Sequence, residues 1–272
     1  MEPVALGLAL LGAFGYGTAS VLQAIGAARA GGGLATLTSP AYLAGLVLDL
    51  LAWLVSLVAL RTLPVYQVQA ILAGSIAVTV LLAWRLLGHR LSRGDGTAIG
   101  VTIAALIVLA ASSGPQPPGH LDPPARLGLG LAAVVVALLG LACALLTRPA
   151  LTGACAGLAF GGAALCARAL VLPEHLATRP FQALTTFAGD PLPWGLLVFG
   201  VSGMLLYAQA LEHGAVGPVT AMLWIAEVVA PSGAGALLLG DTVRAGWLPA
   251  TVAALIAAVG AAGVLAMSES GL

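Results

Sequence analysis

The chain has 272 residues, of which 60% are hydrophobic and only 7% are charged, and its ten basic and ten acidic residues give a formal net charge of zero. A typical soluble domain is about 25% charged, so this composition excludes a soluble protein and indicates a polytopic, all-α membrane protein. The basic residues, all of them arginine, form no run, so a nucleic-acid partner is not expected. The expected surroundings are a lipid bilayer, in a plasma membrane of the bacterial type.

Hydrophobic runs, and the proline and glycine residues between them, predict nine membrane spans. The first span is interpreted as a retained helix, because Met1-Glu2-Pro3 lacks the basic residues that open a cleavable signal peptide. The nine expected spans are residues 3–28, 40–60, 65–87, 96–113, 127–146, 150–172, 194–211, 215–240 and 247–267.

Two polar segments interrupt this pattern. Residues 114–124, GPQPPGHLDPP, are too rich in proline and too polar for membrane depth, and they divide the chain near its middle. Residues 173–193 are expected to form a second, longer loop. Within that loop, residues 181–187 are predicted to be a short amphipathic segment at the membrane interface.

An internal repeat relates the two parts of the chain. Residues 12–25, GAFGYGTASVLQAI, align with residues 157–170, GLAFGGAALCARAL. Residues 59–72 align in the same way with residues 210–223, sharing Ala-Leu at the start and Leu at the end.

The repeat predicts how the chain is organised. We expect a first four-helix repeat in residues 1–113, a linker with one extra helix in residues 114–149, and a second four-helix repeat in residues 150–272. Because the extra helix makes the second repeat start on the other side of the membrane, the two repeats are expected to be inverted. Inverted repeats are a recurrent arrangement in secondary transporters, with the binding site at the repeat interface.

Short motifs near the ends of two spans carry a family resemblance. Residues 86–92, LLGHRLS, and residues 239–241, LGD, resemble the Leu-Gly-Glu-x-hydrophobic signal of the drug/metabolite transporter superfamily. Residues 15–24, GYGTASVLQA, are similar to the first helix of its EamA-like and NIPA-like branch. His89 and Asp241 stand where that family usually has Glu, and nine spans replace the ten of its best-known members. The resemblance implies transport of a small solute or metabolite.

The main candidate for a functional side chain is Glu227, near the middle of the expected span 215–240. An ionised group at the bilayer centre costs about 2.5–3.5 kcal/mol on insertion scales, so this acid needs a function or a partner. Pro231 lies four residues later, where its ring and its missing N–H disturb the backbone at the Glu227 carbonyl. Irregular backbone at membrane depth is tolerated only where protein or water covers it. Glu227 is therefore predicted to bind a proton or a substrate, and a hydrogen-bonded structural acid is the alternative.

A second acid, Asp49, lies near the centre of the expected span 40–60. Trp53 follows it by four residues and Ser56 by three more, which puts the three side chains on one helix face. Trp224 lies one turn before Glu227 in the same way. An acid beside a tryptophan suits a cationic or amphipathic solute through charge and cation–π contact. Packing or lipid contact is the alternative role of Trp53.

Four further polar residues are candidates for the same site. Gln23 in the first span aligns with Arg168 in the sixth. If Arg168 is buried, it is expected to pair with Asp49 or Glu227, and otherwise its side chain reaches the membrane interface. Tyr16 and Gln67 complete the set, with interhelical hydrogen bonds as their alternative role.

Nothing in the sequence indicates catalysis. The four histidines and three cysteines lack the spacing of metal ligands, and no glycine-rich phosphate loop precedes a lysine. We therefore predict no enzyme activity, no cofactor and no metal site.

These observations predict a secondary transporter of a small organic solute, with proton exchange as the coupling hypothesis. A divalent-cation (magnesium) transporter, which the NIPA-like resemblance suggests, and a non-transporting lipid-binding or scaffold protein are the alternatives. The cluster of Arg85, Arg90 and Arg93 favours a cytoplasmic loop after the third span, which places the N-terminus outside. The substrate and the oligomeric state are left open.

Overall fold

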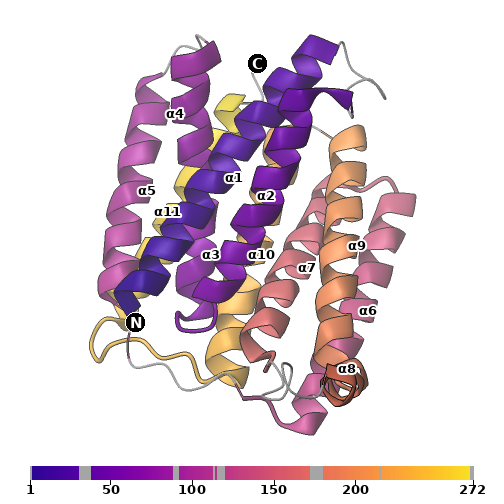
Figure 1. Ribbon diagram of the computed structural model, residues 1–272. Helices are drawn as coiled ribbons and strands as arrows, with labels where there is room; N and C mark the ends of the chain where they lie inside the picture. Colours follow the sequence, from indigo (N-terminus) through magenta and orange to yellow (C-terminus); the bar gives the residue numbers. More distant parts are fainter. Residues whose placement is uncertain are drawn as a thin grey trace. The chain divides into compact units, whose positions relative to one another are not determined.

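The structure is a computed structural model (Figure 1). It describes residues 2–30, 38–87, 92–112, 114, 120–171, 180–214 and 216–269, and these residues form eleven α-helices and no β-strand. In chain order the helices are α1 (Glu2–Ala30), α2 (Pro40–Ala59), α3 (Val65–Ala73), α4 (Ser75–Leu87), α5 (Arg93–Ala111), α6 (Pro123–Leu145), α7 (Pro149–Ala169), α8 (Pro180–Gly189), α9 (Pro191–His213), α10 (Val216–Leu238) and α11 (Leu248–Glu269).

The described helices confirm the predicted all-α membrane architecture. Among them, nine segments are long and apolar enough to cross a membrane, with α3 and α4 together forming the third. Several helices begin earlier than the hydrophobic runs do, because proline and polar caps start them. The side chain of Ser92 accepts a hydrogen bond from the Asp95 N–H, and the Asp95 carboxylate accepts one from the Ser92 N–H, so α5 starts with a capping box. Pro123 and Pro191 occupy the first turns of α6 and α9.

The third span is interrupted at Gly74, which the sequence analysis did not predict. The Gly74 N–H donates to the Ile71 carbonyl oxygen at 3.0 Å, and the Ala77 N–H donates to the Gly74 carbonyl oxygen at 3.1 Å. These bonds reach back three residues, which tightens the helix locally into a 3₁₀-type turn. In contrast, α10 continues through Pro231 as one helix.

Packing divides the chain into two compact units. The first unit contains residues 1–63, 67–113 and 243–272, and the second contains residues 64–66 and 114–242. Helix α11 therefore packs with the first half of the chain, whereas the repeat alignment assigns residues 248–269 to the second repeat. The packing of a helix does not show which segments are copies of each other, so the predicted repeat boundaries remain a prediction.

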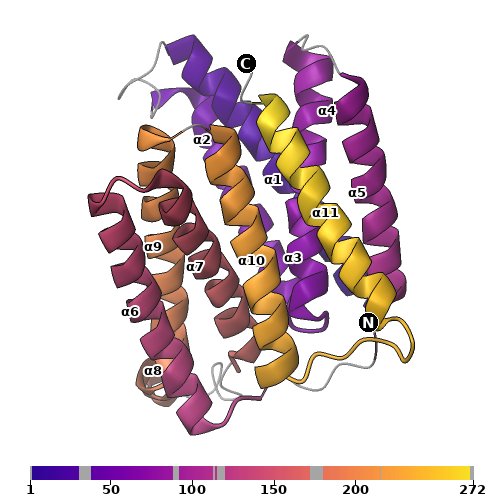
Figure 2. The same ribbon diagram turned by 180° about the vertical axis from the view of Figure 1, so that it is seen from behind.

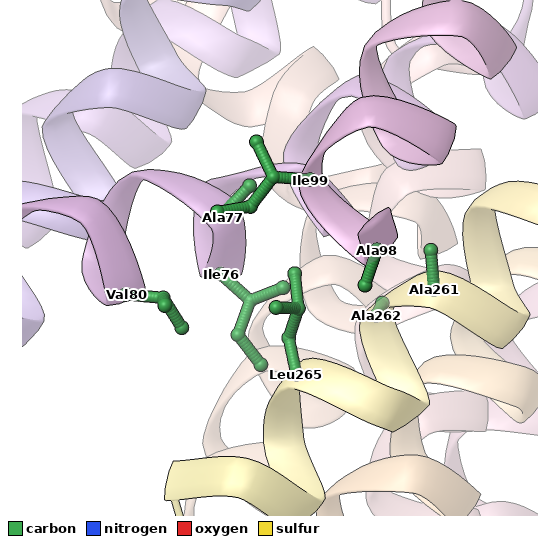
Figure 3. Close-up of a cluster of buried hydrophobic side chains, with 8 residues drawn as sticks. All are labelled: Ile76, Ala77, Val80, Ala98, Ile99, Ala261, Ala262 and Leu265. Atoms are coloured by element: carbon green, nitrogen blue, oxygen red, sulfur yellow. The ribbon is translucent and has the colours of Figure 1, made fainter. Parts of the chain in front are cut away.

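In the first unit, α1 lies antiparallel to α2. A Cβ atom added at Gly15 would lie 2.9 Å from the Ala52 Cβ, and one added at Gly26 would lie 2.7 Å from the Tyr42 Cβ. Helix α11 completes this unit by packing on α4 and α5. Figure 3 shows that contact, in which small and branched side chains interlock: Ile76, Ala77, Val80, Ala98, Ile99, Ala261, Ala262 and Leu265.

In the second unit, α7 is the central helix, and α9 and α10 pack on it (Figure 2). Gly162 of α7 receives the ring of Phe199 from α9, since a Cβ atom there would lie 2.5 Å from the Phe199 Cζ. Helix α6 packs on α7 and α9. The short helix α8 is seen end-on in Figure 1, so it lies across the axis of α9. The segment 181–187, which was predicted to be amphipathic, lies within this helix, and its place at a membrane interface remains a prediction.

Candidate functional site: the α7–α10 helix pair and its acid

Glu227 lies in the part of α10 that packs most closely on α7. Three glycines at spacings of four, Gly153, Gly157 and Gly161, form one stripe along α7. A Cβ atom added at Gly153 would lie 2.8 Å from the Val219 carbonyl oxygen, and one added at Gly157 would lie 2.1 Å from the Leu223 carbonyl oxygen. The two helices are therefore parallel and in backbone contact, as small residues allow in membrane helices.

The helix defect at Pro231 is covered by this stripe. Pro231 removes the N–H that would bond the Glu227 carbonyl. A Cβ atom added at Gly161 would lie 3.0 Å from the Glu227 carbonyl oxygen and 2.2 Å from the Pro231 Cγ. The disturbed carbonyl and the proline ring are thus shielded by protein, as the physics of the bilayer core requires.

Trp224 belongs to an aromatic cluster next to Glu227. It packs with Phe160 and Tyr207 around a buried core of Ala156, Leu206 and Leu223. Its indole Nε1 is buried and makes no hydrogen bond to a described residue. Packing therefore accounts for the ring but not for the N–H group, and an unsatisfied buried donor calls for an explanation.

Arg168 is buried and forms an ion pair with Asp241. The distance from its Nη2 to the Asp241 Oδ1 is 3.1 Å, and each side chain is only 1% exposed. The sequence analysis predicted a pair with Asp49 or Glu227, and that partner assignment was wrong. It failed because it considered only acids inside spans, whereas Asp241 follows the end of α10.

The Leu-Gly-Asp motif explains how Asp241 reaches this position. Gly240 has a φ of 67°, a left-handed conformation that glycine adopts without strain. The Asp241 N–H then bonds back to the Gly235 carbonyl oxygen at 3.2 Å, a bond across six residues that closes the end of α10. The turn directs the carboxylate to Arg168, and its Oδ2 accepts the Val65 N–H at 2.7 Å. Asp241 therefore also caps the positive end of α3.

Asp49 and Trp53 lie on α2, in the first unit. Both side chains are partly buried, and among the described residues no hydrogen bond or ion pair involving Asp49 occurs. The Ser56 hydroxyl, on the same face, donates to the Trp53 carbonyl oxygen at 2.7 Å. Ser56 thus has a structural partner, whereas Asp49 is an acid at mid-span without one in the described part of the chain.

The remaining candidates also lie in the first unit. Gln23 packs against α2 one turn from Asp49, since a Cβ atom at Gly45 would lie 2.8 Å from the Gln23 Cγ. Tyr16 is partly buried in α1. Gln67 is buried, and its Nε2 donates to the Leu109 carbonyl oxygen at 3.4 Å, whereas its Oε1 has no partner among the described residues.

The structure thus sorts the predicted site residues into two groups. Glu227, Trp224 and Arg168 belong to the second unit, and the other five belong to the first. A single site that uses both acids remains a prediction. His89 of the first family-like motif lies outside the described residues.

In the described part of the chain, no group of three His, Cys, Asp or Glu side chains could hold a metal ion. Cys143, Cys155 and Cys166 are free thiols.

These features define the class of protein: a polytopic α-helical membrane protein with a carboxylate inside a close-packed pair of spans. Comparisons of the chain with protein-family models, with curated proteins and with solved structures gave no match.

Proposed function

We propose that the protein is a secondary transporter of the drug/metabolite type, which moves a small cationic or amphipathic organic solute in exchange for protons. One observation carries this proposal: Glu227 lies in a membrane-spanning helix whose backbone is disturbed at Pro231 and packed on a glycine stripe. A carboxylate at such a place is costly unless it is used.

Exchange follows from competition for one carboxylate. A proton and a cationic solute each neutralise Glu227, so each removes the other's favourable interaction with the empty, charged site. Trp224, one turn earlier, offers an aromatic face and an indole N–H without a partner among the described residues, which suits an aromatic or polar cation. Transport then needs only the gradients of the proton and the solute.

Matching contacts within the two units support the repeat on which the family proposal rests. A Cβ atom at Gly12 would lie 3.4 Å from the Leu72 Cδ2, and one at Gly157 would lie 2.1 Å from the Leu223 carbonyl oxygen. In the sequence alignment Gly12 corresponds to Gly157, and Leu72 corresponds to Leu223. Aligned residues thus touch in both units, through the Leu72 side chain in one and the Leu223 backbone in the other, which is compatible with two copies of one helical motif. The inversion of the copies remains part of the proposal.

The test is uptake of ethidium, an aromatic cation, into vesicles containing the purified full chain under an imposed pH gradient. Glu227→Gln should fold normally, because the amide keeps the shape and hydrogen-bonding capacity of the acid, but it should abolish gradient-driven uptake. Asp49→Asn should raise the KM several-fold and retain proton coupling. Glu212→Gln, at an exposed acid of α9, is the matched control.

Normal uptake by Glu227→Gln, with unchanged pH dependence, would leave Glu227 a structural acid and remove the exchange mechanism. Uptake of Mg²⁺ in place of ethidium by the same vesicles would favour the divalent-cation alternative. Vesicles that transport neither would favour the lipid-binding or scaffold alternative.

A further inference from the structure

A depression in the second unit lies where two spans begin. It has a volume of about 370 Å³, within the range of small-ligand sites. Its lining comes from the start of α6, the end of α8 and the start of α9: Leu121, Pro123, Arg126, Thr186, Gly189, Asp190 and Pro191. Because α6 and α9 both start there, the depression lies at the level where membrane spans meet the headgroup layer.

The depression contains a positive and a negative group side by side. The Arg126 Nη1 donates to the Asp190 Oδ2, and the two side chains remain 23% and 18% exposed. The Arg126 Nε donates to the Leu121 carbonyl oxygen at 2.9 Å, and the Asp190 Oδ1 accepts the Leu192 N–H at 2.9 Å. The Arg126 Nη2 makes no hydrogen bond to a described residue, so it is available to an anionic group.

Helix α8, next to the depression, carries apolar side chains on its surface. Phe181 is 83% exposed and Leu184 is 62% exposed, and they lie three residues apart on one face of the helix. The Trp194 ring is also exposed, and its Nε1 donates to the Ala188 carbonyl oxygen at 2.8 Å, which ties α8 to α9. Exposed aromatic and aliphatic side chains on a short in-plane helix are typical of the membrane interface.

The span that begins at the depression also carries exposed apolar side chains. Leu127, which follows Arg126 directly, is 55% exposed, and Leu131, one turn further along α6, is 57% exposed. A lipid whose headgroup contacts Arg126 would therefore find apolar side chains for its acyl chains. These side chains, together with the paired charges, fit a zwitterionic lipid.

We propose that α8 lies in the headgroup layer and that the depression binds the headgroup of an amino-phospholipid. The phosphate accepts hydrogen bonds from Arg126, and the ammonium group of the lipid lies against Asp190. A phosphatidylglycerol headgroup lacks the ammonium group and would place its anionic phosphate near Asp190 without compensation. The site should therefore prefer phosphatidylethanolamine over phosphatidylglycerol.

The experiment is a lipid titration of the detergent-purified full chain, monitored by native mass spectrometry. Phosphatidylethanolamine and phosphatidylglycerol with identical acyl chains are compared, and soluble phosphoethanolamine is the control for headgroup binding without acyl chains. Arg126→Gln should weaken phosphatidylethanolamine binding at least tenfold. Gly189→Leu should do the same while leaving the ion pair in place, because a Cβ atom at Gly189 meets no atom within 4 Å and the side chain would fill the depression.

Gly128→Leu is the matched control, since Gly128 also has open space around it and lies outside the depression. It should bind phosphatidylethanolamine as tightly as the unchanged chain does. Unchanged binding in Gly189→Leu would overturn the proposal, whatever the fate of Arg126→Gln. Equal affinity for the two phospholipids, or equally tight binding of soluble phosphoethanolamine, would overturn it as well.

Discussion

In the second unit α7 packs in parallel against α10, and in the first unit α1 packs in parallel against α4, with Gly12 contacting the Leu72 side chain of α3. Both contacts use glycines of the earlier helix, Gly157 in one unit and Gly12 and Gly17 in the other. The later helix of each pair, α10 in one unit and α3 with α4 in the other, differs between the units. In the second unit it is continuous and carries an acid and a proline, whereas in the first it is interrupted at Gly74 and carries no acid.

This difference shows how a shared packing motif can carry different chemistry. At the α7–α10 contact the glycine stripe packs over the Glu227 carbonyl and the Pro231 ring, and the helix is continuous around Glu227. In the first unit the acid, Asp49, lies on α2, away from the break at Gly74. The two units are thus similar in their backbone contacts and unequal in where they place charge.

The strongest test of the second unit is to break the Arg168–Asp241 pair. Asp241→Asn leaves a buried guanidinium without its carboxylate, and loss of one partner of a buried pair costs about 3–5 kcal/mol. The double variant Arg168→Met with Asp241→Asn removes both charges and keeps an oxygen for the Val65 N–H, so it should recover most of that loss. Denaturant unfolding in detergent micelles measures both free energies of unfolding.

The cycle of single and double variants separates a pair interaction from two independent losses. If the double variant is as unstable as the sum of the two single variants, the pair does not hold the ends of α7 and α10. The first unit has no comparable fully buried ion pair among its described residues, so the expected sensitivity is specific to the second unit.

A smaller effect is expected from alanine at the two aligned glycines. Gly157→Ala places a methyl group 2.1 Å from the Leu223 carbonyl oxygen, a backbone atom that cannot move aside. Overpacking of this kind costs about 1–3 kcal/mol. Gly12→Ala places its methyl group 3.4 Å from its neighbours, so its cost should be well under that range. Equal unfolding midpoints for the two variants would contradict the closer packing of the α7–α10 contact.

The sequence could predict features that depend on local composition. Hydrophobic runs located the nine spans, and residues 181–187 were expected to be a short amphipathic segment, which lies within α8. These features depend on short stretches of chain, and the thickness of the bilayer sets the length of each span.

Features that depend on distant residues could not be predicted. Arg168 and Asp241 are 73 residues apart, and only the packing of α7 beside α10 brings them together. The break at Gly74 was missed because a glycine within an apolar run is ordinary in membrane helices. Only the structure shows that a Cβ atom there would lie 3.0 Å from the Ile71 carbonyl oxygen and 3.1 Å from the Leu106 Cδ1. The pair of Arg126 and Asp190 was missed for the same reason as the pair of Arg168 and Asp241, although Asp190 directly precedes Pro191 and Arg126 lies in the first turn of α6 after Pro124.

A small change in stability, with the sharpest functional contrast, is expected from Pro231→Ala. Alanine restores the N–H for the Glu227 carbonyl, and a hydrogen bond in a membrane protein is worth about 0.6 kcal/mol. The lost contact of the proline ring with Gly161 costs about 1.6 kcal/mol, at about 0.8 kcal/mol for each of two buried methylene groups, and the restored hydrogen bond offsets part of that cost. The free energy of unfolding should therefore change by about 1 kcal/mol, while ethidium uptake should slow because α10 becomes a regular helix at Glu227.

Gly74→Ala is the matched control in the first unit. No acid lies at that helix defect, so ethidium uptake by the Gly74→Ala variant should keep the normal pH dependence. If Pro231→Ala transports at the normal rate, the backbone defect serves packing alone, and any exchange at Glu227 proceeds without it.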